Sequence, residues 1–306
     1  MDDLVSPLSA SPVAGVVMAN VALLRLDRTG GLAPGNKHFK LRGSIAAASH
    51  LGLSRLVSFG GAWSNHLHAL AAAGREQGFA TVGIVRGEET SIESAMLRDA
   101  RAWGMQLHKV SRAEYRLRNE PAYLAQLQAR FAPCMVLPEG GANAEGVRGC
   151  VAIADLLRET APAMRRIVLP VGTGTTLAGV AAGLDGSYEV VGIAALKGAA
   201  DLEQRVTTAL AACGASAVAN WRILHGHHCG GFGRVSAGLR QFIQEFERVQ
   251  GIALDPVYTG KMLFAIHQQL LRGEWDSREP LLAIHTGGLQ GRRGFPWLAP
   301  ASGPLA

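Results

Sequence analysis

The sequence lacks several features that would place it in other classes of protein. Its four cysteines have no CxxC spacing and are too few for a disulfide framework. No apolar run reaches the roughly 18 residues of a membrane-spanning helix. The acidic start Met1-Asp2-Asp3 has no basic segment before an apolar one, unlike a secretory signal. We therefore expect a reduced, cytoplasmic protein without a membrane segment.

Aromatic residues are scarce at 6%, and the basic residues are scattered. A net charge of +6 suits either an anionic ligand or nucleic acid. However, no basic run stands beside aromatic residues that could stack on bases. We expect no nucleic-acid binding, and salt-sensitive retention of oligonucleotides would contradict this expectation.

What the chain has in abundance is hydrophobic residues, at 48%, and 38 glycines among 306 residues. Short apolar segments alternate with longer helical ones, which predicts an α/β fold with parallel sheets covered by helices on both faces. A glycine-rich junction is expected at 140–149. We expect strands at 21–26, 55–59, 81–85, 106–110, 134–137, 166–170, 189–195 and 281–285, and helices between them, including 67–77, 92–103, 114–131, 151–159, 177–184 and 261–272.

Two lysines spaced three apart, Lys37 and Lys40, follow the turn Pro34-Gly35-Asn36 and open an Ala-rich helix. Residues three apart share a helix face, and a helix N-terminus favours anions. The pair therefore suits a phosphorylated ligand, and one lysine could serve as a covalent amine. The motif alone is also consistent with a solvated basic helix start.

Two further glycine-rich turns each lead from a strand into a helix. The residues Gly172-Thr173-Gly174-Thr175-Thr176 can turn backbone N–H groups and hydroxyls toward a phosphate, although a plain tight turn would look the same. The turn has neither the lysine of a Walker A loop nor the third glycine of a dinucleotide fingerprint. In Gly60-Gly61-Ala62-Trp63-Ser64-Asn65-His66, Ser64 or Asn65 can cap the helix and lie exposed at the carboxyl edge of the sheet.

Several motifs occur in a fixed order along the chain. They are Gly35-Asn36-Lys37-x-x-Lys40-Leu41, Gly60-Gly61-x-x-Ser64-Asn65, Gly140-Gly141-x-Asn143, Gly172-Thr173-Gly174-Thr175, Asp255-Pro256-Val257-Tyr258-x-Gly260-Lys261 and His285-Thr286-Gly287-Gly288. With these motifs the chain resembles the ACC deaminase and D-cysteine desulfhydrase family, where ACC is 1-aminocyclopropane-1-carboxylate, within the fold-type II (tryptophan synthase beta-like) pyridoxal-phosphate-dependent enzymes. The resemblance implies a two-domain, open parallel-sheet architecture, with a large domain at 1–51 and 150–306 and a small inserted domain at 52–149.

This family resemblance also implies a cofactor, pyridoxal 5'-phosphate, and roles for individual residues. Lys37 would form the Schiff base, Ser64 would face the substrate and Tyr258 would lie over the reacting centre. Asn65 would bond the cofactor's 3-oxygen and Thr259 would meet the pyridine nitrogen. The phosphate would be held by Lys40 as charge support and by Gly172, Thr173, Gly174, Thr175 and Thr176.

Two departures from the family pattern bear on the reaction. ACC deaminases carry Glu where Thr259 stands, and a hydroxyl there favours elimination of a good leaving group, as in a D-cysteine desulfhydrase. The family usually has Tyr where Phe232 stands, and Phe cannot donate a proton. The resemblance implies a homodimer that acts on a small amino acid and releases ammonia and a 2-oxo acid. D-cysteine is favoured over ACC as the substrate, and a non-catalytic pyridoxal-phosphate-binding protein stays an alternative.

The cluster His225-Gly226-His227-His228-Cys229 contains residue types that bind metals. Its spacing matches no familiar zinc pattern, so we expect a solvated loop, one of whose histidines could contact the substrate, and no metal.

Overall fold

The computed structural model describes residues 4–87, 93–184 and 186–298 and contains two sheets. The larger sheet has six strands, and every neighbouring pair in it is parallel except β1 with β2. Its strands, in spatial order, are β1 (Val5–Pro7), β2 (Val21–Arg25), β10 (Leu281–His285), β7 (Arg166–Val171), β8 (Glu189–Ala194) and β9 (Trp221–Leu224).

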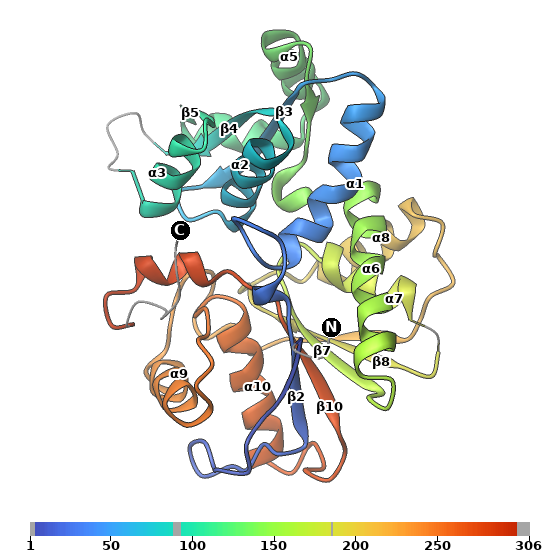
Figure 1. The fold of residues 1–306 in the computed structure, drawn as a ribbon, viewed down its shortest axis with the longest axis vertical. Coiled ribbons are helices and arrows are strands. Elements are labelled where there is room, and N and C mark those ends of the chain that lie inside the picture. Colours follow the sequence, from blue (N-terminus) through green and yellow to red (C-terminus); the bar gives the residue numbers. More distant parts are fainter. Residues whose placement is uncertain (1–3, 88–92, 185, 299–306) are drawn as a thin grey trace.

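The smaller sheet has four strands, all parallel. Figure 1 shows it with its helices at one end of the molecule, above the larger sheet. All four strands fall within the predicted insertion at 52–149, whose boundaries stay a prediction. The order is β5 (Gln106–Val110), β4 (Ala80–Arg86), β3 (Arg55–Gly61) and β6 (Met135–Val136), and the accompanying helices are α2 (Asn65–Gln77), α3 (Ala95–Ala102), α4 (Arg112–Arg116) and α5 (Pro121–Phe131).

Apolar clusters cover both faces of the larger sheet, as expected for a parallel sheet. The helices of this part are α6 (Ala144–Thr160), α7 (Thr175–Gly183), α8 (Leu202–Ala212), α9 (Ala237–Gln250) and α10 (Thr259–Leu271). Along β7, Ile167 and Leu169 pack in one cluster with α6, α7 and α8. Val168 points to the opposite face and packs with α9 and α10.

The lysine helix, α1 (Asn36–His50), begins near the middle of the molecule and runs toward its upper end (Figure 1). Glycines bring its backbone close to α6: a Cβ at Gly149 would lie 2.1 Å from the carbonyl oxygen of Phe39. A side chain at this position would therefore force α1 away from α6 and displace Lys37 and Lys40, which α1 carries.

Several parts of the chain differ from the elements predicted by pattern. The expected junction at 140–149 ends early, because the side chain of Asn143 accepts a bond from the N–H of Gly146 and caps α6, which starts at Ala144. The expected helix at 114–131 is interrupted before Pro121, which begins α5. The edge strands β1 and β9 of the larger sheet are not among the predicted strands. Within the described residues, no helix is both long and apolar enough to span a membrane.

Candidate active site

A cavity of about 940 Å³ lies where strands of both sheets end. Gly61, Arg86, Val171 and Thr286 line it, and each stands at or directly after the carboxyl end of β3, β4, β7 or β10. Ligands of open α/β sheets bind at this edge. The predicted site residues that line it are Lys37, Lys40, Ser64, Asn65, Gly172, Thr173, Gly174, Thr176 and Tyr258, whereas Thr175 and Thr259 do not.

The start of α1 is fixed against the end of β10, and this contact positions Lys37. The N–H of Asn36 donates to the carbonyl of Thr286 at 3.1 Å. Gly35 has φ of +125°, and a Cβ there would lie 2.5 Å from the same carbonyl oxygen, so only glycine fits. The Lys37 Nζ lies 3.1 Å from Asn36 Oδ1, on the cavity wall.

The two lysines have different surroundings. Burial, followed by the positive charge of Lys40, lowers the pKa of Lys37 from 10.5 to about 7. Burial also lowers the pKa of Lys40, whose Nζ donates to Gly140 O and Thr173 Oγ1, both at 3.3 Å. With a pKa of about 7, Lys37 can be uncharged and nucleophilic near neutral pH.

The lowered pKa predicts how the cofactor-free protein responds to pH. The uncharged fraction of Lys37 grows as pH rises through about 7. We expect the rate at which the protein captures pyridoxal phosphate to rise between roughly pH 6 and 8 and then level off. Stopped-flow absorbance tests this expectation, and a capture rate that still climbs steeply at about pH 9 would contradict it.

The lowered pKa of Lys37 also affects stability. The unfolded lysine keeps its pKa of 10.5, so the free energy of unfolding should increase as pH rises from about 7 to 10.5.

The turn after β7 presents donors to the cavity. Gly174 is the N-cap of α7, with φ of +86° and no side-chain hydrogen bond to the first turn. A Cβ on Gly174 would lie 2.9 Å from Val206 Cγ2. Thr173 Oγ1 and Thr175 Oγ1 are 3.0 Å apart, and Asn36 Nδ2 donates to Thr176 Oγ1 at 2.9 Å. An uncapped helix N-terminus with hydroxyls and an ammonium group beside it fits a phosphate group.

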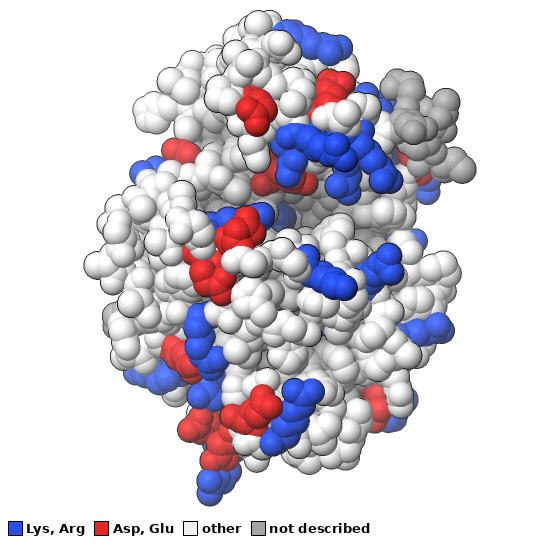
Figure 2. Space-filling view, turned by 180° about the vertical axis from the view of Figure 1, so that it is seen from behind, with Lys and Arg blue, Asp and Glu red and all other residues white. Residues whose placement is uncertain are grey.

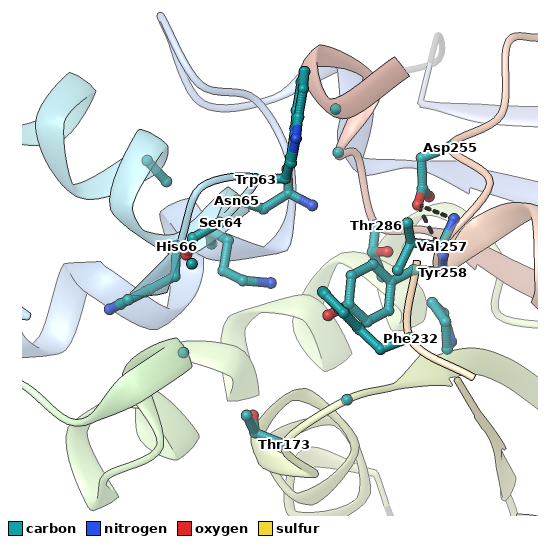
Figure 3. A pocket seen from close by; sticks show the side chains of 18 of the residues that line it. Trp63, Ser64, Asn65, His66, Thr173, Phe232, Asp255, Val257, Tyr258 and Thr286 are labelled. Atoms are coloured by element: carbon teal, nitrogen blue, oxygen red, sulfur yellow. Dashed lines mark hydrogen bonds between the residues drawn. The ribbon is translucent and has the colours of Figure 1, made fainter. Parts of the chain in front are cut away.

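The Ser64–Asn65 turn lies across the cavity from Tyr258 (Figure 3). Ser64 Oγ accepts a bond from Leu67 N–H at 3.2 Å and caps α2. Asn65 Oδ1 accepts a bond from Gln290 Nε2 at 2.9 Å. Both side chains line the cavity while these bonds fix them. The turn can thus present hydroxyl and amide groups in defined positions.

Asp255 organises the turn that carries Tyr258, a role that does not follow from the sequence pattern. Its carboxylate is buried and accepts bonds from the N–H groups of Val257, Tyr258 and Thr259 at 2.8 to 3.0 Å, two of which are drawn in Figure 3. Burial, together with the carboxylates of Asp255 and Glu139, raises the pKa of Tyr258. The phenol therefore stays protonated and can donate a hydrogen bond.

Thr259 is fully buried behind the cavity surface. Its Oγ1 lies 3.5 Å from Thr286 Oγ1, and it is Thr286 that lines the cavity. The hydroxyl nearest to a ligand on this side therefore belongs to Thr286, with Thr259 directly behind it.

Phe232 lies at the mouth of the cavity, where its ring packs edge-on against Tyr258 with centroids 6.2 Å apart. Its loop is held by Lys261, which is completely buried and donates from Nζ to Gly231 O at 2.7 Å and to Ala195 O at 3.2 Å. The role of this lysine does not follow from the sequence pattern either, because only the packing of α10 against the loop brings the two together.

The histidine loop does not assemble a metal site in the described part of the chain, where no three His, Cys, Asp or Glu side chains gather suitably. His225 instead bonds Glu203 through Nε2 at 2.7 Å.

Comparisons with known proteins give consistent matches. A family model described as "Pyridoxal-phosphate dependent enzyme" matches residues 32–287. A Pyrococcus abyssi protein named "Putative 1-aminocyclopropane-1-carboxylate deaminase" is 25% identical over 89% of this chain and 85% of its own. The D-cysteine desulfhydrase of Klebsiella pneumoniae is 26% identical over 92% of this chain and 91% of its own. A crystal structure of an ACC deaminase homologue, 27% identical, has a TM-score of 0.77 and covers 89% of this chain and 85% of that one.

Proposed function

The chain belongs to the pyridoxal-phosphate-dependent enzymes, and from this premise we propose that it is a lyase that eliminates a leaving group from the β-carbon of a small amino acid. The reference reaction is that of a D-cysteine desulfhydrase, in which D-cysteine and one water give pyruvate, sulfide and ammonia. The observation that carries the proposal is Lys37, an amine with a pKa lowered to about 7 on the wall of a cavity that also presents a phosphate-binding turn.

The residues on the cavity wall suit the cofactor as follows. Lys37 would hold it covalently, and Asn65 would bond its ring oxygen. The phosphate group would lie at the N-terminus of α7, against Thr173, with Lys40 supplying a positive charge. Gly172, Gly174, Thr175 and Thr176 shape this turn, since a Cβ on Gly172 would lie 3.1 Å from Tyr258 Cε1.

When bound, the cofactor accepts the electron pair that is left at the α-carbon of the substrate. Lys37, once free, can take the α-proton, because its amine is uncharged above about pH 7. The protonated Tyr258 can donate to the departing group from the opposite wall. Ser64, fixed by its bond to the α2 backbone, can orient the substrate.

The hydroxyls of Thr259 and Thr286 support elimination over ACC ring opening. A hydroxyl leaves a pyridine nitrogen unprotonated, whereas a carboxylate would keep it charged. The carboxylate of Asp255, which holds the turn of Thr259, already accepts three backbone N–H groups. Phe232 also lacks the second hydroxyl that ring opening would use.

A substrate panel tests the proposal. Purified holoenzyme should absorb at roughly 410 to 430 nm, as expected of a lysine-bound pyridoxal phosphate. It should release pyruvate and ammonia from D-cysteine and β-chloro-D-alanine. Release of 2-oxobutanoate from ACC alone would support the activity after which the Pyrococcus relative is named. Cofactor uptake without keto acid from any D- or L-amino acid would instead indicate a non-catalytic binding protein.

The assembly rests on the family resemblance, and the location rests on the four cysteines, which lack the spacing of a disulfide framework. We propose a cytoplasmic homodimer. Light scattering of the purified protein and fractionation of cells test these two points.

A further inference from the structure

Three arginines line the cavity on the side of the smaller sheet, where the proposed reaction has no use for them. Arg86 ends β4, Arg112 begins α4, and Arg118 lies in the short 3₁₀ helix η2 (Leu117–Asn119). Figure 2 shows basic side chains gathered along the rim of a hollow on the face opposite to that of Figure 1. Because the three residues come from separate segments, only the fold brings them together.

A buried tyrosine and a carboxylate organise this group. Tyr115 is buried, with the guanidinium carbon of Arg118 5.1 Å and that of Arg86 5.6 Å from its ring centroid. The Tyr115 hydroxyl donates to Glu139 Oε1, and Arg118 Nε donates to Glu139 Oε2, both at 2.8 Å. The tyrosine ring thus serves as a platform for two guanidinium groups.

The charges in this group do not cancel. Glu139 lines the cavity and compensates Arg118. In residues 4–87, 93–184 and 186–298, no carboxylate forms an ion pair with Arg86 or Arg112. Two positive charges therefore face the cavity without a counter-ion in the described structure. Such charges next to a ligand pocket favour a ligand that carries negative charge.

The position of Arg86 and Arg112 separates them from the cofactor's phosphate. The phosphate turn after β7 already has the N-terminus of α7, its hydroxyls and Lys40. Arg86 lies on the opposite wall: a Cβ on Gly61, which precedes the Ser64–Asn65 turn, would be 3.6 Å from its Nη2. Arg86 pairs with Val110 across the sheet, and Arg112 follows Val110 by two residues. These two arginines thus adjoin the substrate side of the cavity.

We propose that the substrate carries a second anionic group, beyond its α-carboxylate, which binds between Arg86 and Arg112, with Arg118 and Glu139 fixing the platform. Carboxylate, phosphate and sulfate groups share the required chemistry. This inference rests on the proposed lyase function and deepens it. A cavity of about 940 Å³ is near the upper end of the range for small-molecule sites, and can hold a cofactor and a substrate longer than cysteine.

Binding can be measured without turnover. Glutarate and butyrate lack an amine and cannot react, and they differ by one distal carboxylate. By isothermal titration calorimetry of the holoenzyme, glutarate should bind at least about tenfold more tightly, as expected for charge-assisted hydrogen bonds. Arg86→Gln and Arg112→Gln should each reduce this ratio, and the double variant should bring it close to one. The control is Arg116→Gln, on the same helix α4 and exposed but not lining the cavity, which should leave the ratio unchanged.

Turnover provides the second measurement. O-phosphoserine and one water give pyruvate, ammonia and phosphate. In the same reaction of serine, the leaving group is water, and the products are pyruvate and ammonia. The kcat/KM ratio of O-phosphoserine to serine should fall by about tenfold or more in Arg86→Gln and Arg112→Gln, mainly through KM. Aspartate and O-sulfoserine, tested as competitive ligands, distinguish carboxylate from sulfate.

Two results would separate the inference from the function on which it rests. If the holoenzyme releases pyruvate, but glutarate and butyrate bind equally or the arginine variants keep the parent ratios, the second anionic group is refuted and the lyase function stands. If no amino acid yields a keto acid, the lyase function fails and the inference fails with it.

Discussion

Replacing Lys37 with alanine is expected to reduce keto acid release by roughly a thousandfold or more, since a positioned base alone contributes about 10² to 10⁴ and the covalent attachment is lost as well. Lys37 is the lysine whose pKa falls to about 7, and its Nζ lies on the cavity wall beside Asn36. The visible absorbance of the purified protein should disappear at the same time. Spectra and a coupled keto acid assay measure both effects.

The matched control is Lys40→Ala, three residues along the same helix. Lys40 is held by Gly140 O and Thr173 Oγ1 and would bind phosphate through charge. Its replacement should therefore weaken retention of the cofactor on dialysis and yet leave the absorbance band of the saturated enzyme. The opposite pattern, with colour lost in Lys40→Ala and kept in Lys37→Ala, would exchange the roles of the two lysines.

The parts of the site that follow from local chemistry could be predicted from the sequence. The family, the parallel α/β fold and the cofactor are confirmed by the family match and the structural neighbour. The turns at Gly172–Thr176 and Ser64–Asn65 each connect a strand to a helix, and parallel strands carry such turns to one edge of their sheet. The glycines there allow conformations that few other residues adopt, as at Gly174.

Residues whose roles depend on packing between distant segments could not be predicted in this way. Lys261 holds the loop of Gly231, 30 residues earlier, only because α10 packs beneath that loop. The arginines on the cavity wall follow different strands and a short helix, and nothing in their spacing marks them as a group. Thr259 and Thr286 are similar: the family resemblance assigned a role to Thr259 alone, and only the fold shows that Thr286 reaches the cavity.

Asp255→Ala is expected to lower the thermal midpoint of unfolding by about 5 °C or more. The carboxylate is the common acceptor for the N–H groups of Val257, Tyr258 and Thr259, and its loss leaves these donors without a partner in a buried turn. Each buried unsatisfied donor costs about 1 to 3 kcal/mol, so a total of about 3 kcal/mol is a low estimate. Because the entropy of unfolding is about 2.1 cal/mol/K per residue, each kcal/mol corresponds to about 1.6 °C in a chain of this size.

The same substitution should also reduce activity beyond its effect on stability, because the turn positions Tyr258 over the cavity. Asp255→Asn keeps one carbonyl oxygen for two of the three N–H groups and should fall between the parent and Asp255→Ala in both midpoint and kcat. Asp276 is the control: its carboxylate also accepts a backbone N–H, that of Arg278, but in an exposed turn. Asp276→Ala should leave midpoint and kcat nearly unchanged. If Asp255→Ala unfolds at the parent temperature and keeps full activity, the three bonds do not fix the turn, and Tyr258 must be positioned by its packing against Phe232 instead.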